Sequence, residues 1–169
     1  ANVIKIEAPI GINKDSGSLT GARHGSDYQN LHRNKRSLTL DLKSAEGKEI
    51  FFKLAATADV VVENFRSAVK HRLGVDYEAV SKVNPRIVYG SISGFGQDGP
   101  YGKRPGVDQI AQGMGGLMSV TGLPGQGPVR VGIPICDLTA GMFLAQAILI
   151  ALLDREETGQ GQWVHTSLL

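Results

Sequence analysis

Apolar positions along the chain follow two different spacings. Residues 59–63 and 86–93 are short runs rich in β-branched side chains and bounded by polar residues. Apolar residues recur at helical spacing over residues 44–56, where Ser44 can cap the helix, and again over 68–73 and 76–83. Short β-branched runs that alternate with helical patterns are typical of strands buried in a parallel sheet. The pattern therefore predicts an α/β fold with a mainly parallel sheet.

The two ends of the sequence fit the same pattern. Residues 3–7 and 163–169 are both interpreted as strands, and residues 138–153 predict a long apolar helix. A parallel sheet rarely begins without a preceding turn or helix, so we expect a segment to precede residue 1. We therefore expect residues 1–169 to be one partial domain of a longer protein.

Composition narrows the class of protein. With 41% hydrophobic residues and a formal net charge of +2, the chain has the make-up of a soluble globular domain. No unbroken apolar run approaches the roughly 20 residues of a membrane-spanning helix, so no membrane association is expected. Few aromatic residues and no recognisable nucleic-acid module argue against a nucleic-acid partner.

The single cysteine, Cys136, cannot form an internal disulfide. This favours a reducing compartment, so a cytoplasmic location is expected, or a mitochondrial or peroxisomal one in a eukaryote. The four histidines, at positions 24, 32, 71 and 165, show no metal-ligand spacing, and no cysteine cluster accompanies them. The sequence therefore predicts no metal site.

Polar and glycine residues follow the predicted strands at residues 63–66 and 94–100. The carboxyl ends of parallel strands meet at one edge of a sheet, where ligands bind. Gly94, Gly96 and Gly99 match the dinucleotide-binding pattern, but the chain continues as a loop instead of opening a helix. We therefore expect no nicotinamide or flavin cofactor. The glycines are expected to allow a tight turn and a close approach of the backbone to a ligand.

Asp137 stands between a Gly/Pro-punctuated apolar run, residues 129–136, and the long predicted helix. At that junction its carboxylate would face the first free N–H groups of the helix, and the helix dipole would hold it ionised. An ionised, partly desolvated aspartate can act as a nucleophile. Aspartate is also a preferred N-cap, which requires no chemistry. The local pattern alone leaves both interpretations open.

Taken together, segments along the chain resemble the class III coenzyme A transferases, also called the CaiB/BaiF family. The resemblance covers nearly the whole chain, in order and spacing. The matching segments are residues 1–7, 33–43 (RNKRSLTLDLK), 59–66 (DVVVENFR), 84–89, 91–101 (SISGFGQDGPY), 106–112, 137–141 (DLTAG) and 158–162.

This resemblance implies a Rossmann-like large domain with helices on both faces of the sheet. In the family, two subunits interlock as a homodimer, and each chain is more than twice as long as this one. The parts expected to be missing are the first strand and helix, which help to hold coenzyme A, and the small domain.

The resemblance also implies a reaction. Asp137 matches the family's catalytic aspartate, which moves coenzyme A from an acyl-CoA donor to a carboxylic acid acceptor. The expected intermediates are an aspartyl-acyl anhydride and a β-aspartyl-CoA thioester. Acyl-CoA and a small carboxylic acid are therefore the expected substrates.

Coenzyme A contacts carried over from the family fall on nine residues. Lys43 and Arg72 can offer charge to phosphates. Ala8 departs from family members that carry an arginine there, so one nucleotide contact is expected to be absent. The nine residues are Leu40, Asp41, Leu42, Lys43, Asn64, Phe65, Arg66, Arg72 and Leu73.

The alternative activity is that of the α-methylacyl-CoA racemase branch of the same family. That branch uses the histidine of a Gly-His-Asp segment, but here the matching residues are Gly106, Val107 and Asp108. Valine cannot exchange a proton, so the transferase is favoured. A non-catalytic CoA-binding fragment, or a small-molecule binding domain in which Asp137 only caps its helix, stays open.

Overall fold

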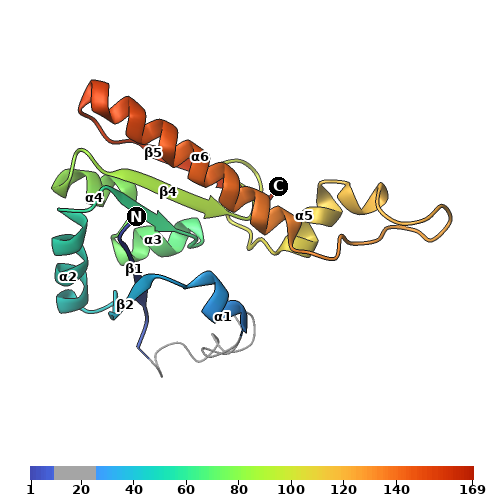
Figure 1. Ribbon diagram of the computed structural model, residues 1–169, viewed down its shortest axis with the longest axis horizontal. Helices are drawn as coiled ribbons and strands as arrows, with labels where there is room; N and C mark the ends of the chain where they lie inside the picture. The colour runs from blue at the N-terminus through green and yellow to red at the C-terminus, as the bar shows by residue number, and fades with distance from the viewer. Residues whose placement is uncertain (10–25) are drawn as a thin grey trace. The chain divides into compact units, whose positions relative to one another are not determined.

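The computed structural model describes residues 1–9 and 26–169 (Figure 1). The chain divides into two compact units, Ala1–Phe51 and Phe52–Leu169. Each unit is described by itself. That residues 1–169 form one partial domain stays a prediction.

The N-terminal unit contains a parallel strand pair. Strand β1 (Val3–Glu7) pairs with β2 (Lys35–Thr39), so that Glu7 lies opposite Thr39. Helix α1 (Ser26–Leu31) precedes β2. The sequence predicted β1 but not β2, because the sequence of β2, KRSLT, contains a single strongly apolar residue and four of its five residues are exposed.

Helix α2 (Ala45–Ala55) begins in the N-terminal unit, where residues 44–56 predicted a helix. The backbone N–H of Gly47 donates to the Ser44 hydroxyl at 2.9 Å, so Ser44 caps the helix as expected. A Cβ on Gly47 would overlap the Asp41 carbonyl oxygen. The glycine therefore lets the turn at residues 40–44 pack directly on the first turn of α2.

The C-terminal unit is built on a three-stranded parallel sheet. Strands β3 (Val60–Glu63), β4 (Val88–Ser93) and β5 (Trp163–Ser167) lie in the order β3-β4-β5. Tyr89 pairs with Trp163 in register. The central strand β4 is the most buried, and Val88 and Tyr89 are fully shielded from solvent. The prediction of a parallel α/β fold is confirmed.

Helices cover both faces of this sheet. The Tyr89 hydroxyl donates to the Val75 carbonyl at 2.7 Å, next to helix α4 (Tyr77–Val83). A Cβ on Gly90 would lie 3.0 Å from Ile148 of helix α6 (Ile135–Thr158). Successive side chains of a strand point to opposite faces. Helices α4 and α6 therefore pack on opposite faces of β4, and the absence of a side chain at Gly90 lets α6 approach closely.

Helices α3 (Ser67–Leu73) and α4 match the helices predicted for residues 68–73 and 76–83. Gly74 ends α3 in a left-handed conformation with φ 68°. Asp76 then caps α4 by accepting the Ala79 N–H at 3.1 Å.

Helix α6 starts earlier and ends later than the predicted helix at residues 138–153. Its C-terminal end leads into the amino end of β5, so its N-terminal end lies towards the carboxyl ends of the strands (Figure 1). Arg155 anchors the last turns, because its guanidinium bonds the Asp59 carboxylate at 2.9 Å and the Arg86 carbonyl at 3.1 Å.

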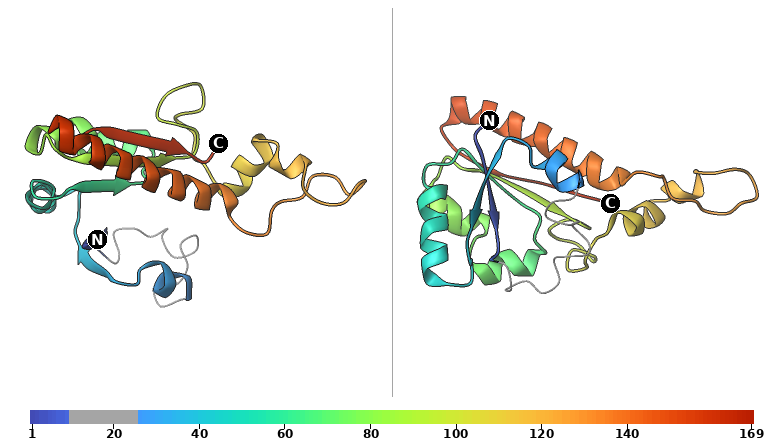
Figure 2. Two further views of the ribbon diagram at one scale, coloured as in Figure 1. Left: turned by 45° about the horizontal axis from the view of Figure 1, so that its top comes forward. Right: turned by 60° about the horizontal axis from the view of Figure 1, so that its bottom comes forward.

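Two short elements between β4 and α6 were not predicted. They are α5 (Asp108–Met114) and a 3₁₀ turn at Leu117–Ser119. The glycine- and proline-rich segment at residues 120–134 follows, and it projects from the C-terminal unit (Figure 2).

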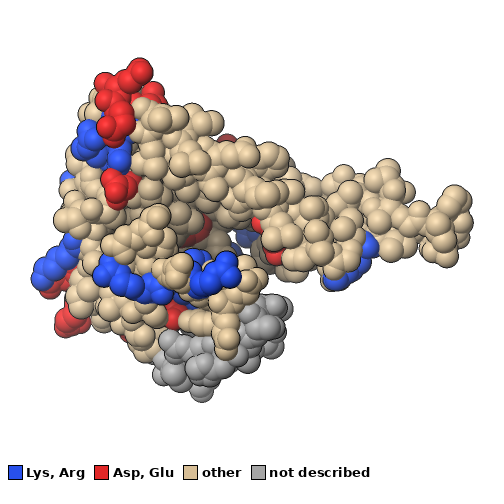
Figure 3. Space-filling model, in the orientation of Figure 1, with Lys and Arg blue, Asp and Glu red and all other residues tan. Residues whose placement is uncertain are grey.

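Much of the surface of α6 is apolar and exposed. Met142, Phe143, Ile150 and Leu153 are each between 58% and 72% exposed. Figure 3 shows a largely uncharged surface along this helix, with acidic side chains gathered at its C-terminal end.

By length and composition alone, α6 is long and apolar enough to cross a membrane. Its most apolar stretch has a mean hydropathy of 1.9, and 17% of that stretch is buried in the described part of the chain. Asp137, Thr139 and Gln146 interrupt the apolar run in this helix, so counting unbroken apolar residues does not exclude a membrane span. A core helix of a soluble protein has the same composition, so the absence of membrane association stays a prediction.

Candidate active site

Asp137 lies in the first turn of α6 and is exposed. Its carboxylate has no hydrogen-bond or ion-pair partner within residues 1–9 and 26–169. The residue at the N-cap position is Pro134, which makes no side-chain capping bond. The interpretation of Asp137 as the N-cap is therefore wrong, and its carboxylate is accessible to a ligand.

The first N–H groups of α6 are already bonded. The N–H of Ile135 donates to the Ile133 carbonyl at 2.8 Å, and that of Leu138 donates to the Pro134 carbonyl at 3.0 Å. The N–H groups of Cys136 and Asp137 both donate to Oδ1 of Asp108, at 2.8 and 3.4 Å. The expectation that Asp137 faces free N–H groups is corrected, because Asp108 of α5 accepts the two hydrogen bonds instead.

Asp108 is buried, with 7% of its surface exposed. Its Oδ2 atom accepts a hydrogen bond from Nε2 of Gln112 at 2.6 Å. The Gln112 Oε1 atom in turn accepts the N–H of Val131 at 2.8 Å. These bonds join α5, the segment before α6 and the first turn of α6 into one polar network.

Two glycines place this network beside the sheet. A Cβ on Gly94, at the end of β4, would overlap the Gly106 backbone, and a Cβ on Gly106 would overlap Gly94. The sequence interpretation assigned the close backbone approach at Gly94 to a ligand. The structure shows that Gly94 approaches the protein's own backbone, two residues before Asp108.

The electrostatic environment of Asp137 differs from the expectation that the helix dipole holds it ionised. Although the residue as a whole is exposed, neighbouring atoms partly desolvate its carboxyl, and this desolvation, together with the negative charge of Asp108, raises the pKa of the Asp137 carboxyl above its ordinary value. The pKa of the neighbouring Cys136 thiol is raised as well, first by burial and then by Asp108 and Asp137. Asp137 is therefore a more basic carboxylate than an isolated aspartate.

A buried ion pair lies beneath the segment that follows β3. Lys70 of α3 is 1% exposed, and its Nζ atom lies 3.0 Å from Oε1 of Glu63. The same ammonium donates to the Ser91 hydroxyl at 3.2 Å and to Oε1 of Gln97 at 2.7 Å. It also lies 4.7 Å from the centre of the Trp163 ring. Lys70 therefore links α3 to all three strands and to the glycine-rich loop after β4.

Glu63 connects this pair to the predicted coenzyme A contacts at residues 64–66. Its Oε2 atom accepts the N–H of Phe65 at 2.7 Å, and its Oε1 atom accepts a hydrogen bond from the Ser91 hydroxyl. Asn64 and Arg66 are exposed, whereas Phe65 is partly buried. The buried carboxylate thus fixes a turn that presents Asn64 and Arg66 to solvent.

The predicted contacts Arg72 and Leu73 lie at the C-terminal end of α3. Arg72 is exposed and Leu73 is partly buried. The predicted contacts therefore lie at both ends of α3. Its N-terminal end follows Asn64, Phe65 and Arg66, and its C-terminal end contains Arg72 and Leu73.

The remaining predicted contacts, Leu40 to Lys43, lie in the N-terminal unit after β2. Leu40 is buried, Asp41 and Leu42 are partly buried, and Lys43 is exposed. Oδ1 of Asp41 accepts the Lys43 N–H at 2.9 Å, which fixes the turn. Because Leu40 is buried, we expect any contact between this residue and coenzyme A to involve its backbone atoms rather than its side chain.

Glu7, at the end of β1, lies in the same unit. Burial raises the pKa of its carboxyl. Hydrogen bonds from Lys5, Ser37 and Tyr28, together with the charge of Lys5, outweigh this effect and lower the pKa to about 2. Glu7 is thus held ionised.

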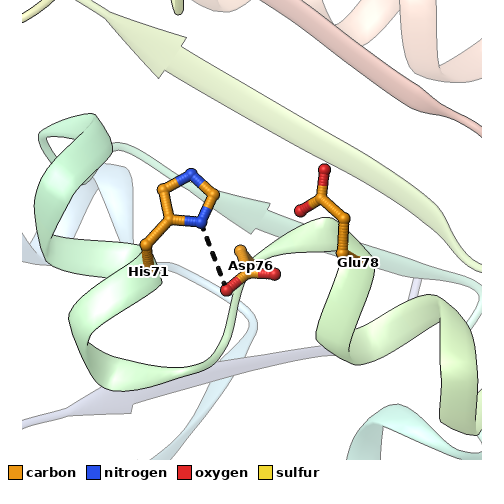
Figure 4. Close-up of side chains that lie close together, drawn as sticks. All are labelled: His71, Asp76 and Glu78. Atoms are coloured by element: carbon orange, nitrogen blue, oxygen red, sulfur yellow. Dashed lines mark ion pairs between the residues drawn. The ribbon is translucent and has the colours of Figure 1, made fainter.

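His71, Asp76 and Glu78 form a cluster that the sequence interpretation did not identify (Figure 4). Their potential ligand atoms lie within 4.8 Å of one another, and Nδ1 of His71 lies 3.4 Å from Asp76. The turn at Gly74 brings them together. The Asp76 carboxylate already caps α4, and exposed acidic groups of this kind are common without a metal. The absence of a metal site stays a prediction.

Two residues important to the candidate site were missed, Asp108 and Lys70. A lysine in the Ser67–Leu73 helix gives no sequence signal of burial, since lysine is normally exposed. The sequence presents Asp108 only as part of the Gly-Val-Asp segment. It is separated from Asp137 by 29 positions in the sequence, which gave no indication of contact.

The fold and site define an α/β protein with an exposed, basic carboxylate towards the carboxyl ends of a parallel sheet. Comparison with known proteins places the whole chain in one family. The model of CoA-transferase family III matches residues 1–169, and the chain belongs to this family. The resemblance found in the sequence is confirmed.

Similar proteins carry CoA-transferase names. The chain is 39% identical to succinate–glutarate CoA-transferase of Agrobacterium fabrum, matching 100% of this chain and 44% of the relative. It is 42% identical to formyl-CoA:oxalate CoA-transferase of Streptomyces coelicolor, over 99% of this chain and 41% of that protein. The chain therefore spans less than half the length of these relatives.

A solved structure shows the same fold. The crystal structure of a CaiB/BaiF family protein from Brucella suis superimposes with a TM-score of 0.90 at 40% identity. The match covers 99% of this chain and 46% of the solved chain.

Proposed function

We propose that this protein transfers coenzyme A from an acyl-CoA to a carboxylic acid, with Asp137 as the nucleophile. The observation that carries the proposal is the exposed carboxylate of Asp137 at the start of α6, which has no partner among the described residues, and the raised pKa of this carboxyl agrees with it. Membership of CoA-transferase family III and the names of the relatives supply the reaction class.

The proposed reaction begins when the Asp137 carboxylate attacks the thioester carbonyl of the donor. The carbon–sulfur bond breaks, giving an acyl-aspartyl anhydride and a coenzyme A thiolate. The thiolate then attacks the aspartyl carbonyl of the anhydride. This releases the donor acid and leaves a β-aspartyl-CoA thioester.

The second half reverses these steps with the acceptor. The acceptor carboxylate attacks the aspartyl thioester and displaces the thiolate, which forms a second anhydride. Attack of the thiolate on the acceptor's acyl carbonyl releases the new acyl-CoA and regenerates the Asp137 carboxylate. No net proton transfer is needed, which suits a site with a carboxylate as its only reacting side chain.

Each unit carries proposed coenzyme A contacts. In the C-terminal unit they are Asn64, Phe65, Arg66, Arg72 and Leu73, and in the N-terminal unit they are the four residues from Leu40 to Lys43. Lys43 and Arg72 are exposed cations suited to phosphate groups.

Trapping the covalent intermediate tests the proposal. We expect that full-length protein incubated with an acyl-CoA and hydroxylamine acquires a hydroxamate on Asp137, because hydroxylamine attacks the activated aspartyl carbonyl. Mass spectrometry of the peptide containing residue 137 detects the modification. Samples without acyl-CoA are the control and should remain unmodified. An unmodified Asp137 during measured turnover would exclude the covalent route.

The racemase alternative gives a different result. Solvent deuterium would enter the α-carbon of a 2-methylacyl-CoA without any acceptor acid. Val107, in the Gly-Val-Asp segment, precedes α5 and has no group that exchanges a proton. We therefore expect no such incorporation.

We also propose that the full-length protein is a homodimer in which a second copy covers the apolar face of α6. Phe143 and Ile150 lie on one side of this helix and are 60% and 67% exposed. We expect sedimentation to show a dimer that Phe143→Glu with Ile150→Glu disrupts. Glu156→Gln, at the acidic end of α6, is the control. A monomeric wild-type protein would refute the proposal.

A further inference from the structure

We infer that Asp108 is a positioning residue for the reaction at Asp137, because it caps α6 in place of Asp137 and so leaves the reactive carboxylate unbonded. This inference rests on the proposed function. It adds a second carboxylate, from a different helix, to the residues on which transfer depends.

The geometry of the α6 cap carries the inference. A helix begins with N–H groups that lack partners within the helix, and a carboxylate in the first turn is attracted to them. Here Oδ1 of Asp108 takes the N–H groups of Cys136 and Asp137, at 2.8 and 3.4 Å. The remaining first-turn N–H groups bond to backbone carbonyls. The Asp137 side chain therefore has no unbonded N–H group of its own helix to fold back on.

This arrangement affects reactivity. A carboxylate that accepts hydrogen bonds from N–H groups is stabilised in its ionised form, and its electron pairs are less available for attack. By taking these bonds, Asp108 preserves the nucleophilicity of Asp137. Its hydrogen bond to the Asp137 N–H also fixes the backbone from which the reacting side chain extends.

Asp108 is itself held rigidly. Its Oδ2 atom accepts from Gln112 at 2.6 Å, and its residue is 7% exposed. The contact between Gly94 and Gly106 fixes the backbone two residues earlier. A buried carboxylate whose two oxygens both accept hydrogen bonds is fully paired, so Asp108 is built into the fold rather than free to react.

The negative charge of Asp108 also favours a nucleophilic carboxylate at Asp137. The titratable groups that influence Asp137 are Asp108 of α5 and the thiol of Cys136 on α6. Within the described residues, no basic side chain lies within ion-pair distance of Asp137. Burial and the Asp108 charge together raise the Asp137 pKa. Since the nucleophile must be ionised, the rate of transfer should rise with pH through this raised pKa.

Two variants separate charge from position. Asp108→Asn removes the charge, but the new amide group faces Nε2 of Gln112, so two donors oppose each other. Asp108→Asn with Gln112→Glu restores a donor–acceptor pair, because a glutamate carboxylate can accept from the new amide and still accept the Val131 N–H. The double variant therefore keeps the bonds to Val131 and between positions 108 and 112, loses the 3.4 Å bond from Gln112 to the Ile133 carbonyl, and moves the charge from position 108 to position 112. Asp76→Asn is the matched control, since Asp76 is a buried carboxylate that caps α4.

The experiment measures transfer by the full-length protein across pH, with the KM for acyl-CoA and the thermal unfolding temperature. We expect Asp108→Asn to lower kcat about 10- to 100-fold with little change in KM, as misplacement of a reacting group does. The acidic limb of its pH profile should move to lower pH. The double variant should recover most of kcat and retain the shifted limb.

Three results would overturn the inference. The first is wild-type kcat and an unchanged acidic limb in Asp108→Asn. The second is the same loss in Asp76→Asn, which would indicate a general loss of stability. The third is an unshifted acidic limb of the pH profile in the double variant, when its unfolding temperature shows that this variant is folded. Full transfer activity in Asp137→Ala would instead refute the proposed function.

Discussion

Replacing Asp137 with alanine or asparagine should abolish CoA transfer, lowering kcat by about 1,000-fold or more. The loss is large because neither side chain can form the acyl anhydride, so the covalent route is closed rather than slowed. Product formation followed by chromatography measures the rate. Binding of coenzyme A should remain largely intact, because the proposed contacts lie on other residues.

The same variants should not lose stability. The Asp137 carboxyl has a raised pKa in the folded protein, so folding favours its protonated form. The stability that this provides is present below the ordinary aspartate pKa and is lost as the pH rises through the raised value. At neutral pH the ionised group is therefore slightly unfavourable, and Asp137→Asn should unfold at the same or a higher temperature. Normal turnover in either variant would reject Asp137 as the nucleophile.

Replacing Lys70 with methionine should produce the largest loss of stability, about 3–5 kcal/mol in the free energy of unfolding. The change leaves Glu63 buried without its ionic partner, since the Glu63 side chain is 6% exposed. It also removes hydrogen bonds to Ser91 and Gln97. Chemical denaturation of the full-length protein measures the change.

A double variant identifies the cause of this loss. Lys70→Met with Glu63→Gln removes both charges, while the oxygen of the introduced amide can still accept the Phe65 N–H. We expect it to be more stable than Lys70→Met alone. The control is Glu156→Gln, which removes an exposed ion pair to Arg86 at 3.8 Å and should cost less than about 1 kcal/mol. Equal losses in the single and double variants would show that the unpaired charge is not responsible.

The sequence predicted the strands of the C-terminal unit well because each is a short run of β-branched or apolar residues, and the central strand is buried. Strands such as Val60–Glu63 and Val88–Ser93 appear as short apolar runs, and capped helices separate them. Elements that lack such a pattern were missed. Strand Lys35–Thr39 is mostly exposed, and helix Asp108–Met114 buries the polar residues Asp108 and Gln112, so its inner face gives no apolar repeat.

At the candidate site, the sequence indicates Asp137, whose catalytic role stays a prediction, but its surroundings differ from those expected. The sequence shows an aspartate at the start of an apolar helix. It does not show which group bonds the N–H groups of that helix, because Asp108 comes from another helix 29 residues away. The same holds for Lys70, whose burial depends on Gln97 and Trp163, both distant in sequence.

The proposed nucleophile shares one continuous helix with the anchor at Arg155. The 24 residues of α6 span about 36 Å. Near one end Asp108 holds the backbone of Asp137, and near the other Arg155 holds Asp59 and the Arg86 carbonyl. Between them, close packing at Gly90 opposes sideways displacement. Contacts at both ends of α6 thus fix its position along its axis, so we expect a change at Arg155 to shift the carboxylate of Asp137 as well.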